Sequence, residues 1–203
     1  MKLLNIKLLF ASLLLFNVSL FGEEKAKKRS FWIPKNVTLQ HAGSIGYFSA
    51  GFGYNLNKSG KSTLDFMYGN VPESKGGDLN IFTTKFAWRP FNIPIKDWAI
   101  IHPINPGIFI SYHRGKNFDS KWDDVNYPKG YYWWSTAIRP HISFTTEVKI
   151  DAKKILKNTK IKHISFYNEI NTNELYFISY IQNNRTLSLT QVFKLGLGAK
   201  VYF

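Results

Sequence analysis

Apolar and polar residues alternate along much of the chain, and the alternation is clearest in the last segment, Val192–Phe203. Successive side chains of a β-strand point to opposite faces, so an every-other-residue pattern predicts a strand with one apolar and one polar face. The apolar row is Phe193, Leu195, Leu197, Ala199, Val201 and Phe203, and the alternate row is Lys194, Gly196, Gly198, Lys200 and Tyr202.

The same alternation recurs upstream. With the last segment, the predicted strands are Val37–Ala42, Ile45–Leu56, Ser62–Gly69, Leu79–Arg89, Gly107–Arg114, Ser135–Val148, Lys160–Ile170 and Val192–Phe203. An apolar-out, polar-in wall is typical of membrane barrels. We therefore expect residues 36–203 to form an all-β fold, an up-and-down antiparallel transmembrane β-barrel of eight strands with a polar, plugged lumen. Ten strands are the alternative, if Glu174–Ile181 or Trp98–Ile104 also pair.

The start of the chain predicts export. Lys2 and Lys7 precede the mostly apolar run Leu8–Phe21, and Gly22 is followed by two glutamates. This order is that of a secretory signal peptide, so we expect residues 1–22 to be removed and residues 23–35 to form a basic periplasmic segment. An N-terminal membrane anchor is the alternative for the apolar run. No later run reaches the about 20 apolar residues that a transmembrane helix needs.

The end of the last predicted strand points to an outer membrane. A final amphipathic strand with Phe193 and Val201 on its apolar face and Phe203 at its end resembles the signal read by the machinery that assembles outer-membrane barrels. Residues 71–77 and 127–134 also resemble a group of small exported bacterial barrels with no assigned activity, over most of the mature chain. The resemblance implies export through the inner membrane to a Gram-negative outer membrane. The implied partners are outer-membrane lipids, lipopolysaccharide and the assembly machinery, and a monomer is expected.

An even strand number with both ends in the periplasm orients the loops. Residues 57–61, 90–106 and 149–159 are then periplasmic turns, while residues 70–78, 115–134 and 171–191 are extracellular. The middle outer loop is rich in aromatic and charged residues. We accordingly expect a non-enzymatic barrel whose outer loops contact surface partners or lipopolysaccharide.

Charge narrows the choice of partner. The chain has 27 basic and 13 acidic residues and a net charge of +14. A basic surface attracts phosphates, and export favours lipopolysaccharide over nucleic acid, for which no recognition module is present. The alternative is that lysine-rich turns only keep the loops solvated. No cofactor is expected, and five scattered histidines without any cysteine predict no metal site.

The interior of an eight-stranded barrel is only wide enough for side chains, and buried charges must be paired. We therefore predict a lumen charge network in which acidic residues neutralise lysines and arginines. Its members are Asp65, Lys85, Arg89, Arg139, His141, Glu147, His163, Glu169, Lys194 and Lys200. A narrow conduit for small solutes is the alternative.

One phrase occurs twice, as His-Ile-Ser-Phe-x-x-Glu at residues 141–147 and 163–169. Ser, His and an acid can together generate a nucleophile. The candidates for such a role are His141, Ser143, Glu147, His163, Ser165 and Glu169. The His-x-Ser pair resembles lipid A 3-O-deacylase barrels, which implies a lipid A or phospholipid acyl hydrolase as an alternative function.

Two departures count against this hydrolase. Phe144 follows Ser143 where that family continues with Ser-Asn-Ala, and alternation turns His141 and Ser143 into the lumen rather than toward lipid. We instead expect two adjacent strands with similar inward sets. Arg139, His141 and Glu147 would then meet His163 and Glu169 across the ladder.

Overall fold

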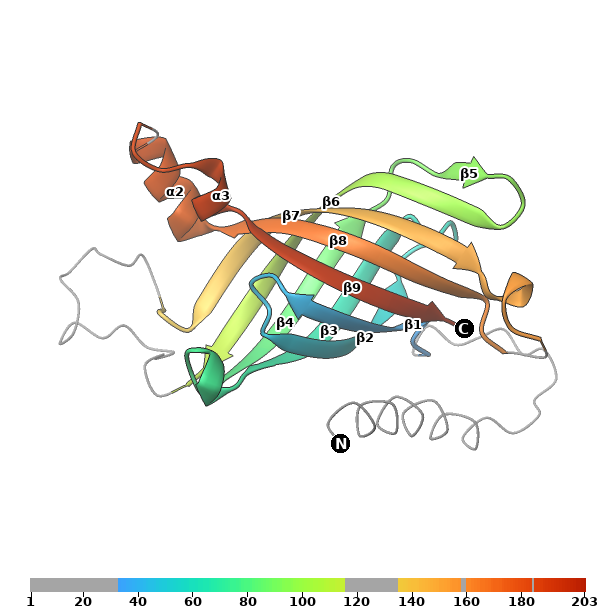
Figure 1. Ribbon diagram of the computed structural model, residues 1–203, viewed down its shortest axis with the longest axis horizontal. Coiled ribbons are helices and arrows are strands. Elements are labelled where there is room, and N and C mark those ends of the chain that lie inside the picture. Colours follow the sequence, from blue (N-terminus) through green and yellow to red (C-terminus); the bar gives the residue numbers. More distant parts are fainter. Residues whose placement is uncertain (1–32, 116–134, 158–159, 184) are drawn as a thin grey trace. The chain divides into compact units, whose positions relative to one another are not determined.

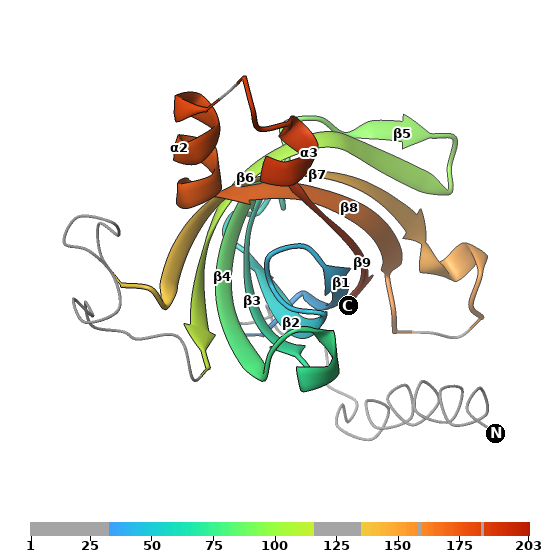
Figure 2. The ribbon, with the colours of Figure 1, turned by 60° about the vertical axis from the view of Figure 1, so that its left-hand side comes forward.

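The computed structural model describes residues 33–115, 135–157, 160–183 and 185–203. The chain divides at Ile33, and the unit Pro34–Phe203 contains the β-barrel drawn in Figures 1 and 2. The predicted signal peptide, most of the predicted periplasmic segment and residues 116–134 of the middle outer loop lie outside the described residues.

Eight antiparallel strands close into the barrel. They are β1 (Asn36–Ala42), β2 (Phe48–Asn55), β3 (Ser62–Val71), β4 (Leu79–Trp88), β6 (Ala99–Arg114), β7 (Ile138–Asp151), β8 (His163–Asn173) and β9 (Lys194–Tyr202). Strand β4 pairs with β6, and β1 pairs with β9 to complete the ring. The prediction of an all-β, antiparallel, eight-stranded barrel is confirmed. Closure matters because it gives each of these strands a neighbour on both sides.

Neither segment that could have added a strand, Trp98–Ile104 or Glu174–Ile181, forms an additional strand of the ring. Residues 99–104 are the start of the long strand β6, and the short strand β5 (Ile93–Ile95) pairs with them as a hairpin beside the ring. The expectation that residues 90–106 form only a turn was therefore wrong. The chain stays extended through Pro103 and Pro106 because an irregularity between His102 and Asn105 shifts the register with β7, and a bulge accommodates such residues.

Helices occupy much of the predicted loop 171–191. Helix α2 (Glu174–Gln182) begins where the Asn173 side chain accepts a hydrogen bond from the Tyr176 backbone N–H, and α3 (Leu189–Val192) precedes β9. A capping side chain of this kind satisfies a backbone donor that a helix start leaves open. Single 3₁₀ turns follow β3 (Glu73–Lys75) and β7 (Ala152–Lys154). Among the described residues, no helix is both long and apolar enough to cross a membrane.

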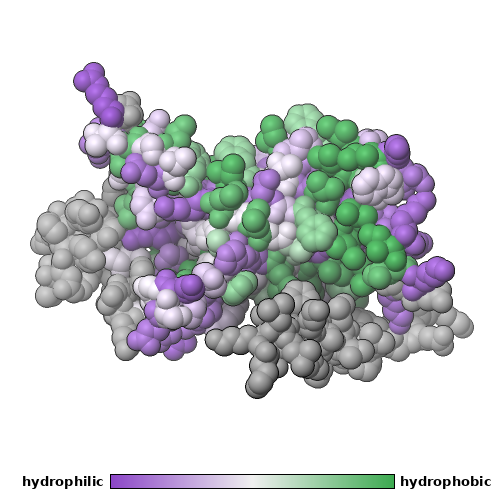
Figure 3. Space-filling model, viewed as in Figure 1, coloured by the Kyte–Doolittle hydropathy of each residue, from purple (hydrophilic) through white to green (hydrophobic). Residues whose placement is uncertain are grey.

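The barrel is apolar on its outside. Large exposed apolar side chains of the strands form what we call the apolar belt, and Figure 3 shows such side chains over much of one face. The belt includes Phe52, Phe66, Tyr68, Phe82, Phe86, Trp88, Ile108, Ile110, Tyr112, Ile142, Phe144, Phe166, Ile170, Leu195 and Leu197. Tyr68, Phe82 and Tyr112 are cross-strand neighbours on β3, β4 and β6, with ring centroids 5.3 and 6.5 Å apart.

The two ends of the barrel differ. We call the end where β1 starts and β9 stops the terminal end, and the other the opposite end. At the opposite end the β1–β2 connection, residues 43–47, folds inward, so that Ile45 is fully buried against Met67 and Phe109. A Cβ atom at Gly69 would lie only 1.7 Å from the Ile45 carbonyl oxygen. Glycine is therefore required there, and the inward turn brings Ile45 into the lumen.

Candidate functional site: the polar lumen

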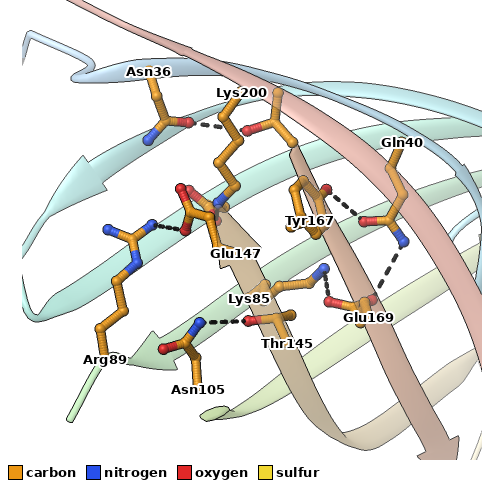
Figure 4. A network of polar contacts seen from close by, with 12 residues as sticks. Asn36, Gln40, Lys85, Arg89, Asn105, Thr145, Glu147, Tyr167, Glu169 and Lys200 are labelled. Carbon is orange, nitrogen blue, oxygen red and sulfur yellow. Dashed lines mark hydrogen bonds and ion pairs between the residues drawn. The ribbon is translucent and has the colours of Figure 1, made fainter. Parts of the chain in front are cut away.

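Three ion pairs fill the part of the lumen nearer the terminal end, and each joins strands or strand ends that are not neighbours in the ring (Figure 4). Lys200 Nζ on β9 lies 2.6 Å from Asp65 Oδ2 on β3, and Arg89, just after β4, lies 3.0 Å from Glu147 on β7. Lys85 on β4 pairs with Glu169 on β8. All six side chains are less than a tenth exposed. The structure thus brings each buried carboxylate to a cation.

Neutral groups add hydrogen bonds to two of these three carboxylates. The Tyr202 hydroxyl donates to Glu147 Oε1 at 2.6 Å and accepts from Arg89 Nη2 at 2.8 Å. Gln40 accepts from the Tyr167 hydroxyl at 2.7 Å and donates to Glu169 Oε1 at 3.3 Å. Burying a charge is tolerated only when its partner and its remaining hydrogen bonds are in place. These contacts meet that condition for Glu147 and Glu169.

The lumen is packed rather than open. A cavity among the ion pairs has a volume of about 10 Å³, which is roughly the space of a single water. Its lining consists of Thr63, Asp65, Lys85, Ala87, Arg89, Thr145, Glu147, Tyr167, Glu169 and Lys200. Together with the inward turn at the opposite end, this packing argues against a solute conduit.

We expect the refolded barrel to produce no single-channel steps in planar bilayers, because the cavity among the three ion pairs has only about the volume of one water. The measurement is current at fixed voltage after insertion of the refolded protein. Bilayers given the same detergent without protein are the control. Discrete, reproducible steps from the wild-type chain would contradict a plugged lumen.

A second polar cluster lies at the opposite end of the lumen. Ser111 Oγ is 2.9 Å from His141 Nε2 and 3.0 Å from His113 Nε2, and the His141 ring stacks on Phe109 with centroids 4.2 Å apart. Sequence reasoning had missed Ser111, although its alternation with His113 on β6 was the available signal. The other ring nitrogen of His141, Nδ1, has no hydrogen-bond partner among the described residues. In this part of the chain no carboxylate is therefore bonded to the imidazole, as one would be in a Ser–His–acid triad.

The two copies of the repeated phrase do not lie side by side. The β7–β8 register places His141 opposite Asn173 and His163 opposite Asp151, so the histidines stand at opposite ends of the pair. The two strands are adjacent and antiparallel as predicted, and Glu169 lies opposite Thr145, two residues from Glu147. The predicted meeting of Arg139 and His141 with His163 was wrong. The antiparallel register extends β8 to Asn173 and carries the two phrases past one another. Ser143 and Ser165 are both buried and turned inward.

Three other predicted lumen residues lie toward the barrel ends. Arg139 Nη1 donates to Glu174 Oε1 at 2.9 Å and so links the barrel to α2. His163 is half-buried at the start of β8. Lys194 is in phase with the inward row but is the first residue of β9, paired with Asn171 of β8, where it is exposed and its Nζ donates to the Gln191 carbonyl at 3.1 Å. Lys194 was wrongly assigned to the lumen because alternation predicts which face of the wall a residue is on, and not how far along the barrel axis it lies.

The residues of the predicted assembly signal are separated in the structure. Phe193 caps α3, with its N–H donating to the Leu189 carbonyl, and is not part of β9. Val201 is on β9 in the outward phase, and the Phe203 N–H donates to the Lys35 carbonyl at 3.1 Å. Their role in assembly stays a prediction.

The described residues contain no group of three or more potential metal-ligating side chains. Comparisons of the chain with protein-family models, with curated proteins and with solved structures give no match. Fold and lumen together define the class: a closed, eight-stranded antiparallel β-barrel with a charged interior filled by side chains.

Proposed function

We propose that this protein is an integral, non-enzymatic β-barrel of a bacterial outer membrane whose outer loops contact surface partners or lipopolysaccharide. The observation that carries the proposal is the inverted polarity of the barrel, in which the apolar belt surrounds ion pairs. Soluble monomers rarely expose contiguous apolar patches beyond a few hundred Å². In the hydrocarbon of a bilayer, apolar side chains are instead favoured on the outside. A closed barrel also pairs all its backbone N–H and C=O groups there.

Strand length also supports a membrane. A tilted transmembrane strand needs about 9–11 residues, and β3, β4, β8 and β9 have 10, 10, 11 and 9. The longer β6 and β7 extend past the ring at the terminal end, where β5 pairs with β6.

We place the opposite end of the barrel outside the cell. That end presents an aromatic group in which Tyr47 contacts His41 and Phe48, with ring centroids 4.8 and 5.0 Å apart. Lys75 Nζ lies 5.4 Å from the centre of the Tyr47 ring. Aromatic and cationic side chains of this kind suit contact with a sugar-phosphate surface, which supports the proposed role of the outer loops.

The acyl-hydrolase alternative gains no support from the lumen. Ser143 and His141 are 1% and 3% exposed and face inward, whereas a lipid ester would lie against the apolar belt on the other side of the wall. A nucleophile must come within hydrogen-bonding reach of the group it attacks.

Heat-modifiable migration tests the proposal. Protein refolded into detergent should run differently on a gel when unheated than when boiled, because a closed hydrogen-bonded ring resists detergent until it is heated. Refolding without detergent or lipid is the matched comparison, and it should fail. A soluble monomer that folds equally well without detergent would overturn the proposal.

A further inference from the structure

Exposed lysines gather at the terminal end of the barrel, on three separate turns. We call them the lysine rim: Lys58 and Lys61 between β2 and β3, Lys96 between β5 and β6, and Lys153, Lys154 and Lys157 between β7 and β8. The described carboxylates in these turns are Asp97 and Asp151. The rim therefore carries a large excess of positive charge.

Local contacts neutralise little of this excess. Asp97 Oδ2 lies 2.5 Å from Lys154 Nζ, and the hydrogen bond from Lys154 holds the pKa of the Asp97 carboxyl below its usual range. The Asp151 carboxylate accepts a hydrogen bond from the Lys153 backbone N–H and so caps the 3₁₀ turn. Among the described residues, Lys58, Lys61 and Lys96 form no ion pair, and the one carboxylate beside Lys96, that of Asp97, is paired with Lys154.

The opposite end is more balanced. Its described residues include Lys75, Arg114, Arg185 and Lys194 together with Glu73, Asp78 and Glu174, and Glu174 is paired with Arg139. From the sequence alone, the excess positive charge was expected to face lipopolysaccharide. Most of it lies instead at the terminal end.

Each turn of the rim also exposes apolar side chains beside its lysines. They are Leu56 near Lys58, then Phe91, Ile93 and Trp98 around Lys96, and Ile155 and Leu156 between Lys154 and Lys157. Ile155 is 60% exposed and lies in a lysine-flanked turn. A turn that only needed hydration would not expose such groups. Lysines beside exposed aliphatic and aromatic residues are typical of a membrane interface, where the stems contact hydrocarbon and the ammonium groups reach the headgroups.

We infer that the lysine rim binds the phosphate groups of anionic glycerophospholipids in the leaflet at the terminal end, with the adjacent apolar side chains inserted among their acyl chains. The inference rests on the proposed membrane location and adds the lipid class and the leaflet. The lysines are spread over three turns. This arrangement suits a ring of lipid headgroups around the barrel better than a single bound molecule. Basic residues next to a membrane are attracted to its anionic lipids through their charge.

The test uses the full mature chain in vesicles of equal phosphatidylglycerol and phosphatidylethanolamine. Folding is first checked by heat-modifiable migration. The protein is then extracted in mild detergent, and the lipids that remain bound are counted by native mass spectrometry. We expect phosphatidylglycerol to be enriched on the wild-type barrel. Enrichment should fall by roughly fivefold or more in K58E/K61E/K153E, given the contribution of each basic residue.

A matched variant at the opposite end, R114E/R185E/K194E, should retain the enrichment. If charge reversal at the rim prevents folding, K58Q/K61Q/K153Q gives the same comparison with milder changes. Equal retention of both lipids by the folded wild type, or an equal loss in the two triple variants, would overturn the inference. So would rim-dependent sedimentation with purified peptidoglycan in the absence of any lipid preference. A chain that fails to fold into the vesicles at all would instead overturn the proposed membrane location.

Discussion

Replacing Glu147 with alanine should lower the free energy of unfolding by about 3–5 kcal/mol, the usual cost of removing one partner of a buried ion pair. The Arg89 side chain is 5% exposed and would keep its charge in the lumen without the carboxylate 3.0 Å away. The Tyr202 hydroxyl would lose its acceptor at the same time. The measurement is a urea titration of protein refolded in vesicles, with the unheated gel band as the folded fraction.

Two further variants show that the effect comes from the unpaired charge. R89M/E147M removes both partners and should recover much of the lost stability, because replacing a buried pair with apolar groups is often close to neutral. Asp97→Asn breaks the exposed pair with Lys154 and should leave the urea midpoint unchanged, since exposed ion pairs contribute little. If Glu147→Ala and Asp97→Asn behaved alike, the lumen network would not stabilise the barrel.

The face on which each strand residue lies could be predicted from alternation alone. Asp65, Glu147 and Glu169 were expected to neutralise basic residues inside the barrel, and the structure places each beside a lysine or an arginine. The identity of each pair could not be predicted. Partners across a lumen depend on the stagger between strands, whereas a period of two residues specifies only the side of the wall.

The same limit explains the main errors. Lys194 has the inward phase but stands at the exposed start of β9, and His141 pairs with Asn173 because β8 spans His163–Asn173 rather than the predicted Lys160–Ile170. Ile45 was read as the start of a strand, although it turns inward and fills the lumen with Met67 and Phe109. The sequence around Ile45 does not show whether this residue begins a strand or turns inward. The inward turn depends on the close approach of Ile45 to Gly69, which arises from tertiary packing.

Helix α2 was a different kind of error. Its sequence, Glu-Leu-Tyr-Phe-Ile-Ser-Tyr-Ile-Gln, contains many residues that favour strands. The decisive signal was local: Asn173 followed by Glu174 is a favourable helix start. None of the described strands pairs with this segment, so a helix, which pairs its own backbone groups, is the structure that satisfies it.

Replacing Leu197 with arginine separates a membrane barrel from a soluble one most directly. Leu197 is 56% exposed on β9 and belongs to the apolar belt. On a soluble barrel the change would alter stability by no more than about 0.5 kcal/mol. On the lipid face near the bilayer midplane it should cost about 2–4 kcal/mol, falling to about 0–1 near the interface.

The matched control is Leu156→Arg, because Leu156 is also exposed but lies in the β7–β8 turn at the terminal end. We expect a clear loss of folded protein in vesicles for Leu197→Arg and little change for Leu156→Arg, measured by the same urea titration. The contrast depends on depth in a bilayer and not on side-chain chemistry, since both variants introduce the same charge at an exposed leucine. Equal tolerance of the two substitutions would show that water, and not lipid, surrounds the apolar belt.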